Sequence, residues 1–179
     1  SDTPYWQVLN ANSNNTIIDG SANPETTEHG SGILIYSDTD DCITPTIKGF
    51  TIQNGIGTFV TRNPGTQYES QERLGGGILF DIADPTIKYN QFINNGKIFN
   101  DGIITVTANA GGAIYATTED EDWDFNQTPT NYFTLSNRTY CDDIEEFDFS
   151  NNFYNFNDAL YGNTLSNKFF SKSFNMSGS

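Results

Sequence analysis

Apolar and polar positions along the chain alternate in short runs, and these runs repeat. The segment Pro45-Thr46-Ile47-Lys48 returns 40 positions later as Pro85-Thr86-Ile87-Lys88. Each copy is followed by an apolar residue, one spacer and an asparagine, in Ile52-Gln53-Asn54 and in Phe92-Ile93-Asn94. Short runs bounded by Gly, Pro and Asn predict β-strands, and stretches of helix formers with a 3.6-residue apolar spacing are missing. The pattern therefore predicts an all-β fold built from a repeated unit.

A second signature, a Gly-rich start to a short apolar strand, alternates with the first. Its copies stand at residues 32–36, 77–80, 112–115 and, in a degenerate form, 158–161. Further copies of the apolar–spacer–Asn signature are Leu135-Ser136-Asn137, Phe149-Ser150-Asn151 and Leu165-Ser166-Asn167. Self-similarity at a period of tens of residues indicates a solenoid. With short strands it predicts a right-handed parallel β-helix of about four irregular coils.

Stacking of the coils explains why the same segment occurs twice in the sequence. Equivalent residues then lie above one another, so that Ile47 meets Ile87 and Ile52 meets Phe92 in the interior. An asparagine at a corner of the coil tolerates the left-handed backbone conformation, and stacked amides hydrogen-bond along the ladder. The predicted corner asparagines are Asn54, Asn94 and Asn137.

Four segments carry a resemblance to a known family. They are Thr16-Ile17-Ile18-Asp19-Gly20, Gly49-Phe50-Thr51-Ile52-Gln53-Asn54-Gly55, Gly75-Gly76-Gly77-Ile78 and Gly111-Gly112-Ala113-Ile114-Tyr115. The pattern resembles the pectate-lyase-like superfamily of parallel β-helix proteins, and in particular the large secreted or surface-anchored β-helix repeat proteins of bacteria. The resemblance spans residues 16–167 and implies a secreted or cell-surface location. It does not select an activity, because the superfamily includes lyases, hydrolases, adhesins and proteins without assigned chemistry.

The segments between the signatures are predicted to be long loop insertions in the coil. They cover residues 57–74, 97–110 and 117–130. In solenoids such insertions gather on one side and build a binding face. The 179 residues fit a single domain, 1–179. Neither end reads as a polar cap, so we expect a segment of a longer solenoid or a subunit that associates end to end.

The net charge limits the classes of binding partner, and the cysteine content limits the possible disulfides. Eight basic residues stand against 23 acidic ones, a formal charge of −15, which disfavours nucleic acid and anionic membrane surfaces. No apolar run reaches the ~20 residues of a membrane span, and we expect no membrane insertion. Cys42 and Cys141 are the two cysteines. They can pair in an oxidising compartment, be buried thiols, or pair with segments outside this sequence.

One acidic run is a candidate calcium site. Asp120, Asp122, Asp124 and Asn126 alternate along the third insertion. In an extended loop their oxygens can converge on calcium, which takes six to eight oxygen ligands. The run is not an EF-hand, because Phe125 stands where the sharp turn requires Gly. The alternative is a solvated charge run with no metal.

Aromatic residues around the same run are candidates for ligand binding. Trp123, with Tyr115 and Tyr132, can form a platform for a sugar ring beside acidic neighbours that accept hydroxyl hydrogen bonds. The alternative is that these rings cover a small core of the loop itself.

The resemblance implies what an enzyme of this fold requires. Polysaccharide lyases of the superfamily use calcium-binding carboxylates with an Arg or Lys base, and its glycosidases use several Asp residues with a His and a basic pair. Lys48 and Lys88 share a repeat position and are expected to face solvent, while Arg62 and Arg73 lie in the first insertion. No catalytic residue is assigned. We therefore predict a non-catalytic extracellular module, either structural or adhesive, such as a rigid spacer, stalk or filament building block. The alternative is a carbohydrate-active β-helix that binds or cleaves a polysaccharide on its loop face, by lyase chemistry.

Overall fold

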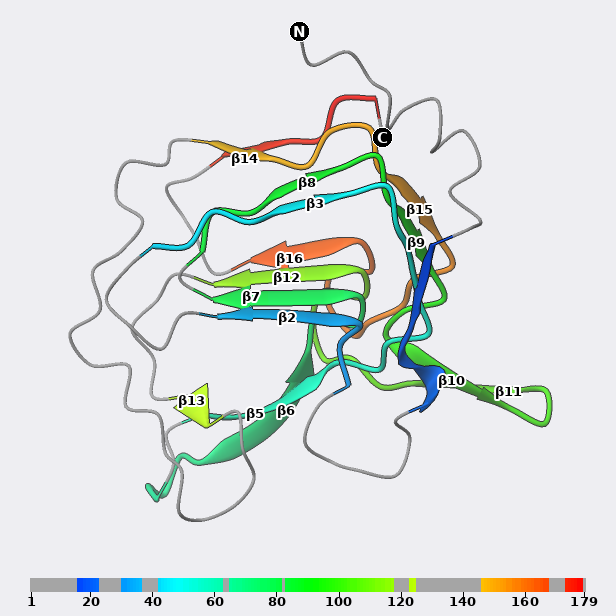
Figure 1. The fold of residues 1–179 in the computed structure, drawn as a ribbon. Coiled ribbons are helices and arrows are strands. Elements are labelled where there is room, and N and C mark those ends of the chain that lie inside the picture. The colour runs from blue at the N-terminus through cyan, green and yellow to red at the C-terminus, as the bar shows by residue number, and fades with distance from the viewer. Residues whose placement is uncertain are drawn as a thin grey trace, which may run out of the picture.

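The computed structural model describes residues 16–22, 30–36, 42–62, 65–81, 83–117, 123–124, 146–167 and 173–178. This part of the chain is all-β, with a single turn of 3₁₀-helix, η2 (Gly20–Ala22), and no α-helix among the described residues. Most strands lie in parallel sheets that are stacked together, an arrangement compatible with a β-helix-like fold (Figure 1).

Three sets of parallel strands form the body of the fold. Sheet A contains, in spatial order, β1 (Ile17–Asp19), β4 (Thr51–Gln53), β9 (Gln91–Ile93) and β15 (Phe153–Asn155). Sheet B contains β2 (Ile33–Tyr36), β7 (Ile78–Asp81), β12 (Ile114–Thr117) and β16 (Leu165–Asn167). The third side is made by the pair β3 (Thr46–Lys48) and β8 (Thr86–Lys88) and by the pair β14 (Glu146–Asp148) and β17 (Ser173–Asn175).

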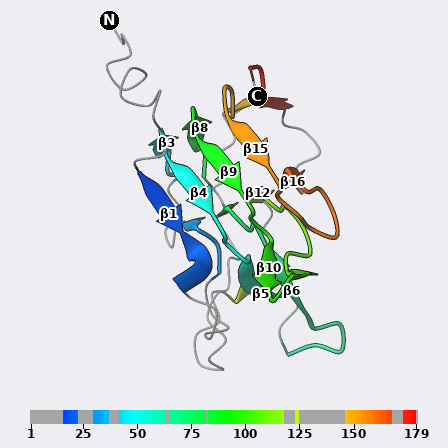
Figure 2. The ribbon, with the colours of Figure 1, turned by 90° about the vertical axis from the view of Figure 1, so that its right-hand side faces the viewer.

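The chain visits the three sides in turn, and each return adds one strand beside the previous one. We call one circuit of the three sides a coil. Figure 2 shows this for sheet A, where β1, β4, β9 and β15 lie side by side in chain order. The predicted ladders are confirmed, because Ile47 pairs with Ile87 and Ile52 pairs with Phe92 in parallel register.

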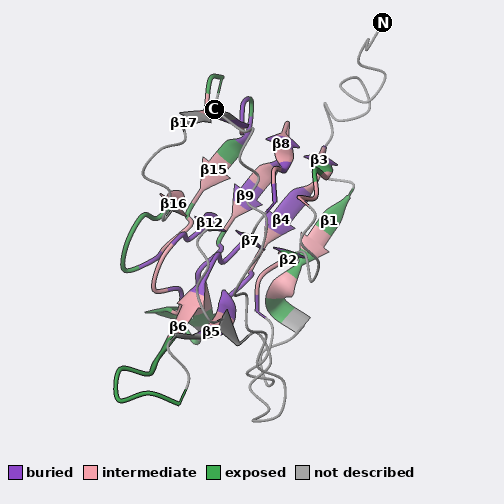
Figure 3. Cartoon of the chain, turned by 90° about the vertical axis from the view of Figure 1, so that its left-hand side faces the viewer, coloured by how far each residue is buried: buried purple, intermediate pink, exposed green. Residues whose placement is uncertain are grey.

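One hydrophobic core lies between the three sides. Strand residues point alternately to the two faces of a sheet, so each side turns only some of its residues toward this core. Figure 3 shows buried residues along β4, β9 and β7. The buried members are Ile35, Ile47, Ile52, Ile78, Phe80, Ala83, Ile87, Phe92, Ala113, Ile114, Ala116, Phe147 and Phe149. Phe80 packs against both Phe147 and Phe149, with ring centroids 5.5 and 5.9 Å away. The core thus joins strands from distant parts of the chain.

The repeat frame needs one correction in the last coil. Asp158–Tyr161 is not the strand start predicted there, because β16 begins at Leu165, in register with Ile114. The shared feature is a glycine with positive φ three residues before the strand: Gly75 (62°), Gly111 (66°) and Gly162 (63°) precede β7, β12 and β16. The backbone conformation, and not the adjacent apolar triplet, therefore identifies the equivalent positions.

The first two insertions are antiparallel hairpins instead of irregular loops. β5 (Thr58–Arg62) pairs with β6 (Ser70–Leu74), and β10 (Lys97–Asn100) pairs with β11 (Ile103–Val106). The β5–β6 hairpin covers the outer face of sheet B, where Val60 and Leu74 form a second core with Leu79 and Tyr115. The β10–β11 hairpin projects from the body (Figure 1).

The third insertion returns to the first. β13 (Trp123–Asp124) pairs with β5, opposite Thr61 and Arg62, and the rest of residues 118–130 lies outside the described ranges. The prediction that insertions gather therefore holds for the first and third of them, since both contribute to one small sheet.

Two asparagine ladders close the corners of the coil from the inside. Asn90 Nδ2 donates to Asn152 Oδ1 at 3.2 Å, and Asn95 Nδ2 donates to Asn157 Oδ1 at 2.9 Å. Asn90, Asn95 and Asn152 are all at least 98% buried. The predicted corner residues stand beside these ladders: Asn54 and Asn94 have φ of 58° and 57°, while Asn137 lies outside the described residues. The equivalent position in the last coil belongs to Phe156, with φ of 53°.

Cys42 is disulfide-bonded. The sequence holds one other cysteine, Cys141, which lies outside the described residues. In the part of the chain that is described, no helix is long and apolar enough to cross a membrane.

Candidate functional site

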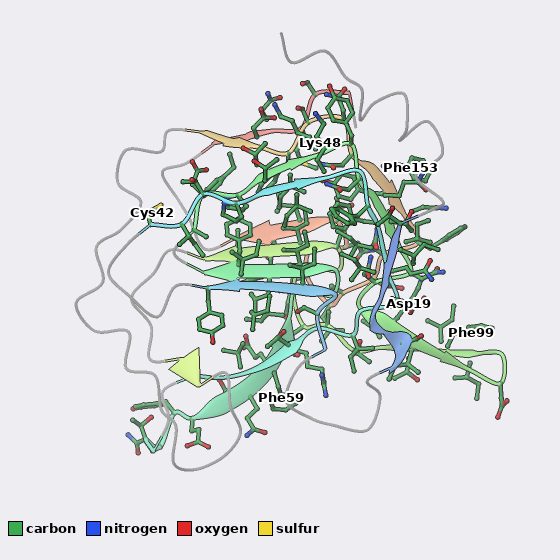
Figure 4. All side chains as sticks on the ribbon, in the orientation of Figure 1. Asp19, Cys42, Lys48, Phe59, Phe99 and Phe153 are labelled. Carbon is green, nitrogen blue, oxygen red and sulfur yellow. The ribbon has the colours of Figure 1, made fainter. Side chains whose placement is uncertain are left out.

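A groove of about 800 Å³ lies between the corner that follows sheet A and the β10–β11 hairpin. Its lining includes Ser21, Asn54, Asn94, Lys97, Phe99 and Phe156. Figure 4 shows Phe99 on the projecting hairpin and Asp19 at the end of β1, on the same side of the molecule. We call this space the corner groove.

The floor of the corner groove is a column of stacked corner positions. Asn54, Asn94 and Phe156 each follow a strand of sheet A by one residue, and all three have a left-handed backbone. Asparagine tolerates this conformation, whereas a bulky aromatic residue rarely adopts it. The column therefore presents two amides and one phenyl ring at regular spacing.

The wall of the corner groove is one face of the β10–β11 hairpin. Its two-residue turn, Asp101-Gly102, has φ of 48° and 80°, as a type I′ turn requires. Lys97 and Phe99 alternate onto the same face, and Phe99 lies directly opposite Ile104 on the other strand. Phe99 is 70% exposed and Ile104 is 55% exposed. The hairpin thus exposes large apolar side chains to solvent.

An ionised carboxylate stands at the rim. Asp19 Oδ2 accepts a hydrogen bond from Gln53 Nε2 at 2.7 Å, and Oδ1 accepts one from Asn54 Nδ2 at 3.0 Å. The backbone N–H of Ser21 also donates to Oδ1, at 2.9 Å. Slight burial opposes ionisation, but these hydrogen bonds outweigh it and hold the pKa of Asp19 well below its usual value. Asp19 is therefore an anchor for neighbouring donors and is poorly suited to be a general acid.

Several polar groups of the corner groove have no protein partner within the described part of the chain. The Asn94 side-chain amide makes no hydrogen bond there, and Asn54 leaves its Oδ1 without a donor. Lys97 makes no ion pair with a described residue, and its Nζ lies 5.8 Å from the centroid of the Phe156 ring. The groove therefore combines available amides, one cation and exposed rings.

The residues predicted for sugar binding are not gathered in this groove. Tyr115 is only 3% exposed and packs with Val60, Leu74 and Leu79 under the β5–β6 hairpin, so its ring is not displayed on the surface. The side chain of Trp123 and all of Tyr132 lie outside the described residues. The three-residue platform stays a prediction, with Tyr115 placed in a core.

The calcium prediction also stays a prediction. Asp120, Asp122 and Asn126 lie outside the described residues, as does the side chain of Asp124. In the described ranges no group of three His, Cys, Asp or Glu residues is close enough to hold a metal ion.

The basic residues have identifiable structural partners. Lys48 and Lys88 stand in register as predicted; Lys88 forms an ion pair with Asp148, and Lys48 Nζ lies 5.2 Å from the Tyr89 ring centroid. Arg73 donates to the Gly57 carbonyl at 2.8 Å, and its guanidinium lies 4.9 Å from the centroid of Phe59. Burial lowers the pKa of Arg73. These contacts give the two lysines and Arg73 structural roles. The side chain of Arg62 lies outside the described part of the chain.

Sequence reasoning missed the corner groove, although one signal for it was present. Asp-Gly between apolar residues is a strong hairpin signal, and Asp101-Gly102 separates Phe99 from Ile103 and Ile104. That signal predicts the hairpin. It does not predict that the hairpin stands beside the corner column, because this depends on the stacking of coils.

The chain matches no protein-family model, and comparisons with curated proteins and with solved structures likewise give no match.

Proposed function

We propose that this chain is a right-handed parallel β-helix module of a secreted or cell-surface protein, and that it acts without catalysis. In this proposal the stacked coils form a rigid body, which flanking domains or further modules extend. The corner groove is its adhesive site. The observation that carries the proposal is the pairing of a rigid corner column with a hairpin that exposes Phe99 and Ile104 to solvent.

Rigidity follows from how the coils are joined. Buried Asn90 and Asn95 each bond to the coil before and the coil after them, so that a coil cannot slide without breaking buried hydrogen bonds. The disulfide at Cys42 favours an oxidising, extracellular compartment. Large exposed apolar side chains beside polar groups are typical of contact surfaces.

The groove lining supports binding more than chemistry. Acid–base catalysis in a groove requires a group whose pKa is tuned toward the working pH. Asp19, the carboxylate at the rim, has its pKa shifted in the opposite direction, and both of its oxygens already accept protein hydrogen bonds. The groups that remain available are amides, an ammonium and phenyl rings, which suit recognition.

Excision of the β10–β11 hairpin tests the proposal. The base of the hairpin is closed by Thr107 N and Ala108 N, which donate to Gly96 O at 2.8 and 3.0 Å, so residues 97–106 can be replaced by Gly-Gly without displacing the coil. We expect the excised chain to keep its melting temperature and to lose adhesion of the labelled protein to intact cells and to immobilised envelope polysaccharides. A matched control, Asp101→Asn, keeps the type I′ turn and should adhere normally.

Two results would overturn the proposal. Equal adhesion of the excised and intact chains would remove the corner groove from the adhesive site. Release of new reducing ends or unsaturated sugars from the same polysaccharides by the intact chain would establish an enzyme instead.

A further inference from the structure

Phe156 occupies a backbone position that does not suit its side chain. Its φ of 53° lies in the left-handed region, where the preceding coils place Asn94 and Asn54. A bulky residue there is a conformational outlier, and such outliers cluster at functional sites. Phe156 is also 69% exposed, so burial of its ring does not offset the strain. Burial of the ring therefore does not explain a phenylalanine at this corner.

The groups around the Phe156 ring can recognise hydroxyls. Lys97 Nζ, 5.8 Å from the ring centroid, offers donors, and the Asn94 amide offers one donor group and one acceptor that no described residue uses. Asn54 adds the acceptor Oδ1, because its Nδ2 is held by Asp19. A ligand that carries both hydroxyls and an apolar C–H face satisfies this set, and a sugar ring has both.

Charge limits the class of sugar. The chain carries a formal charge of −15. Lys97 is the one charged side chain among the described lining residues, and the ionised Asp19 is hydrogen-bonded to the lining residue Asn54. An acidic polymer would bring further carboxylates toward this surface and would be repelled over about 10 Å, the screening length at 0.1 M salt. An uncharged sugar meets no such barrier. The volume, about 800 Å³, is within the usual range of ligand sites.

We infer that the corner groove binds an uncharged saccharide, with one sugar ring stacked on Phe156 and its hydroxyls bonded to Asn94, Asn54 and Lys97. This inference rests on the proposed function and names the ligand class of the same site. Phe99 and Ile104 on the hairpin face the second side of the bound chain.

The test uses a second aromatic corner as its matched control. Tyr89 has φ of 57° and lies beside Lys48, as Phe156 lies beside Lys97, but Tyr89 does not line the corner groove. Phe156→Asn and Tyr89→Asn each put a residue that tolerates the left-handed backbone in place of a ring. Both variants should melt at or above the wild-type temperature, which separates loss of binding from loss of fold.

The measurement is affinity electrophoresis and isothermal titration of the full chain. The neutral probes are xyloglucan, galactomannan and dextran with their oligosaccharides, and the acidic probes are polygalacturonate and alginate. We expect at least one neutral probe to bind wild type and Tyr89→Asn alike, with little dependence on salt, and to bind Phe156→Asn about tenfold more weakly.

Three outcomes would overturn the inference. Preferential binding of an acidic probe that Phe156→Asn removes would keep the site and reject the uncharged class. Equal binding of a neutral probe by wild type and Phe156→Asn would reject Phe156 as the stacking residue. No binding of any probe, while the intact chain but not the hairpin-excised chain adheres to cells, would reject a saccharide ligand and leave the proposed adhesive function standing.

Discussion

The side-chain amide of Asn95 donates to Asn157 Oδ1 at 2.9 Å, although 62 residues separate the two along the chain. Asn95 Nδ2 also donates to the Ile52 carbonyl, at 2.9 Å, and Asn95 Oδ1 accepts from the Gly55 N–H at 3.0 Å. One buried amide therefore satisfies backbone groups of the preceding coil and is itself held by the following coil. The three coils are joined at this corner by side-chain hydrogen bonds in addition to their strand ladders.

Removal of this amide should be costly. Asn95→Ala leaves the Gly55 N–H and the Ile52 carbonyl without their side-chain partner in a buried corner, and each unsatisfied group costs about 1–3 kcal/mol. We expect a loss of about 3 kcal/mol or more in the free energy of unfolding, measured by urea denaturation. The control is Asn94→Gly, an exposed neighbour whose φ of 57° suits glycine, which should change stability by less than about 1 kcal/mol. Similar losses in the two variants would contradict a special role for the buried ladder.

Gly76 should tolerate no side chain. A Cβ at this position would lie 2.3 Å from Gly112 O and 2.3 Å from Gly96 N, so the backbones of neighbouring segments would have to separate. Gly76→Ala is expected to cost about 3 kcal/mol or more, at the upper end of overpacking effects. Gly65→Ala is the comparison, because no atom lies within 4 Å of its Cβ and only its positive φ opposes the change. Thermal melting that ranks Gly65→Ala as the worse variant would refute this packing.

The β5–β6 hairpin should depend on one leucine beneath it. Leu79 belongs to β7 of sheet B and is fully buried beneath this hairpin, which contributes Val60 and Leu74 to the same cluster. Leu79→Ala should lower the free energy of unfolding by about 2–5 kcal/mol. Hydrogen exchange should accelerate first in β5 and β6, while the β10–β11 hairpin stays unchanged. Leu160→Ala, at a site 65% exposed, should have little effect on either measurement.

The Lys88–Asp148 ion pair should make stability depend on acidity. Slight burial raises the pKa of Asp148, but hydrogen bonds from Lys88 and Ser150 outweigh it and hold that pKa below its usual value. A carboxyl whose pKa is lower when folded stabilises the protein above its unfolded pKa, about 3.9, and this contribution is lost as the pH falls through the folded value. Both side chains are about one-third exposed, so the contribution is only about 0.2–1 kcal/mol.

Melting between pH 6 and pH 2 checks this expectation. The difference in stability between wild type and Asp148→Asn should be largest near pH 6 and should shrink toward zero at low pH. A constant gap for Asp148→Asn would exclude its carboxylate as a titrating contributor.

The repeated segments predicted the parallel register correctly because identical side chains were written at equivalent positions. Ile47 and Ile87 are such a pair, and their pairing needs only that one coil lies on the next. The predicted strand start was wrong in the last coil, where Gly162, the glycine with positive φ, has no neighbouring glycine, whereas Gly75 and Gly111 each have one. The sequence also carries a signal for the buried ladder that our predictions did not use. Asn90 and Asn95 have the same five-residue spacing as Asn152 and Asn157.

The amino-acid sequence by itself determined the β-strand character, the stacking of the first two full repeats and the strongly acidic surface. These properties depend on local spacing and composition, which act over a few residues. Only the tertiary structure decided which side chains meet at the corner groove, because Asn54, Asn94, Lys97 and Phe156 come from three different turns of the chain. Contacts of that kind depend on how many residues each insertion adds between equivalent strands. Equivalent strand residues are 40 positions apart from Ile52 to Phe92 and 62 positions apart from Phe92 to Tyr154. Spacings this unequal leave no fixed period in the sequence from which the contacts could be predicted.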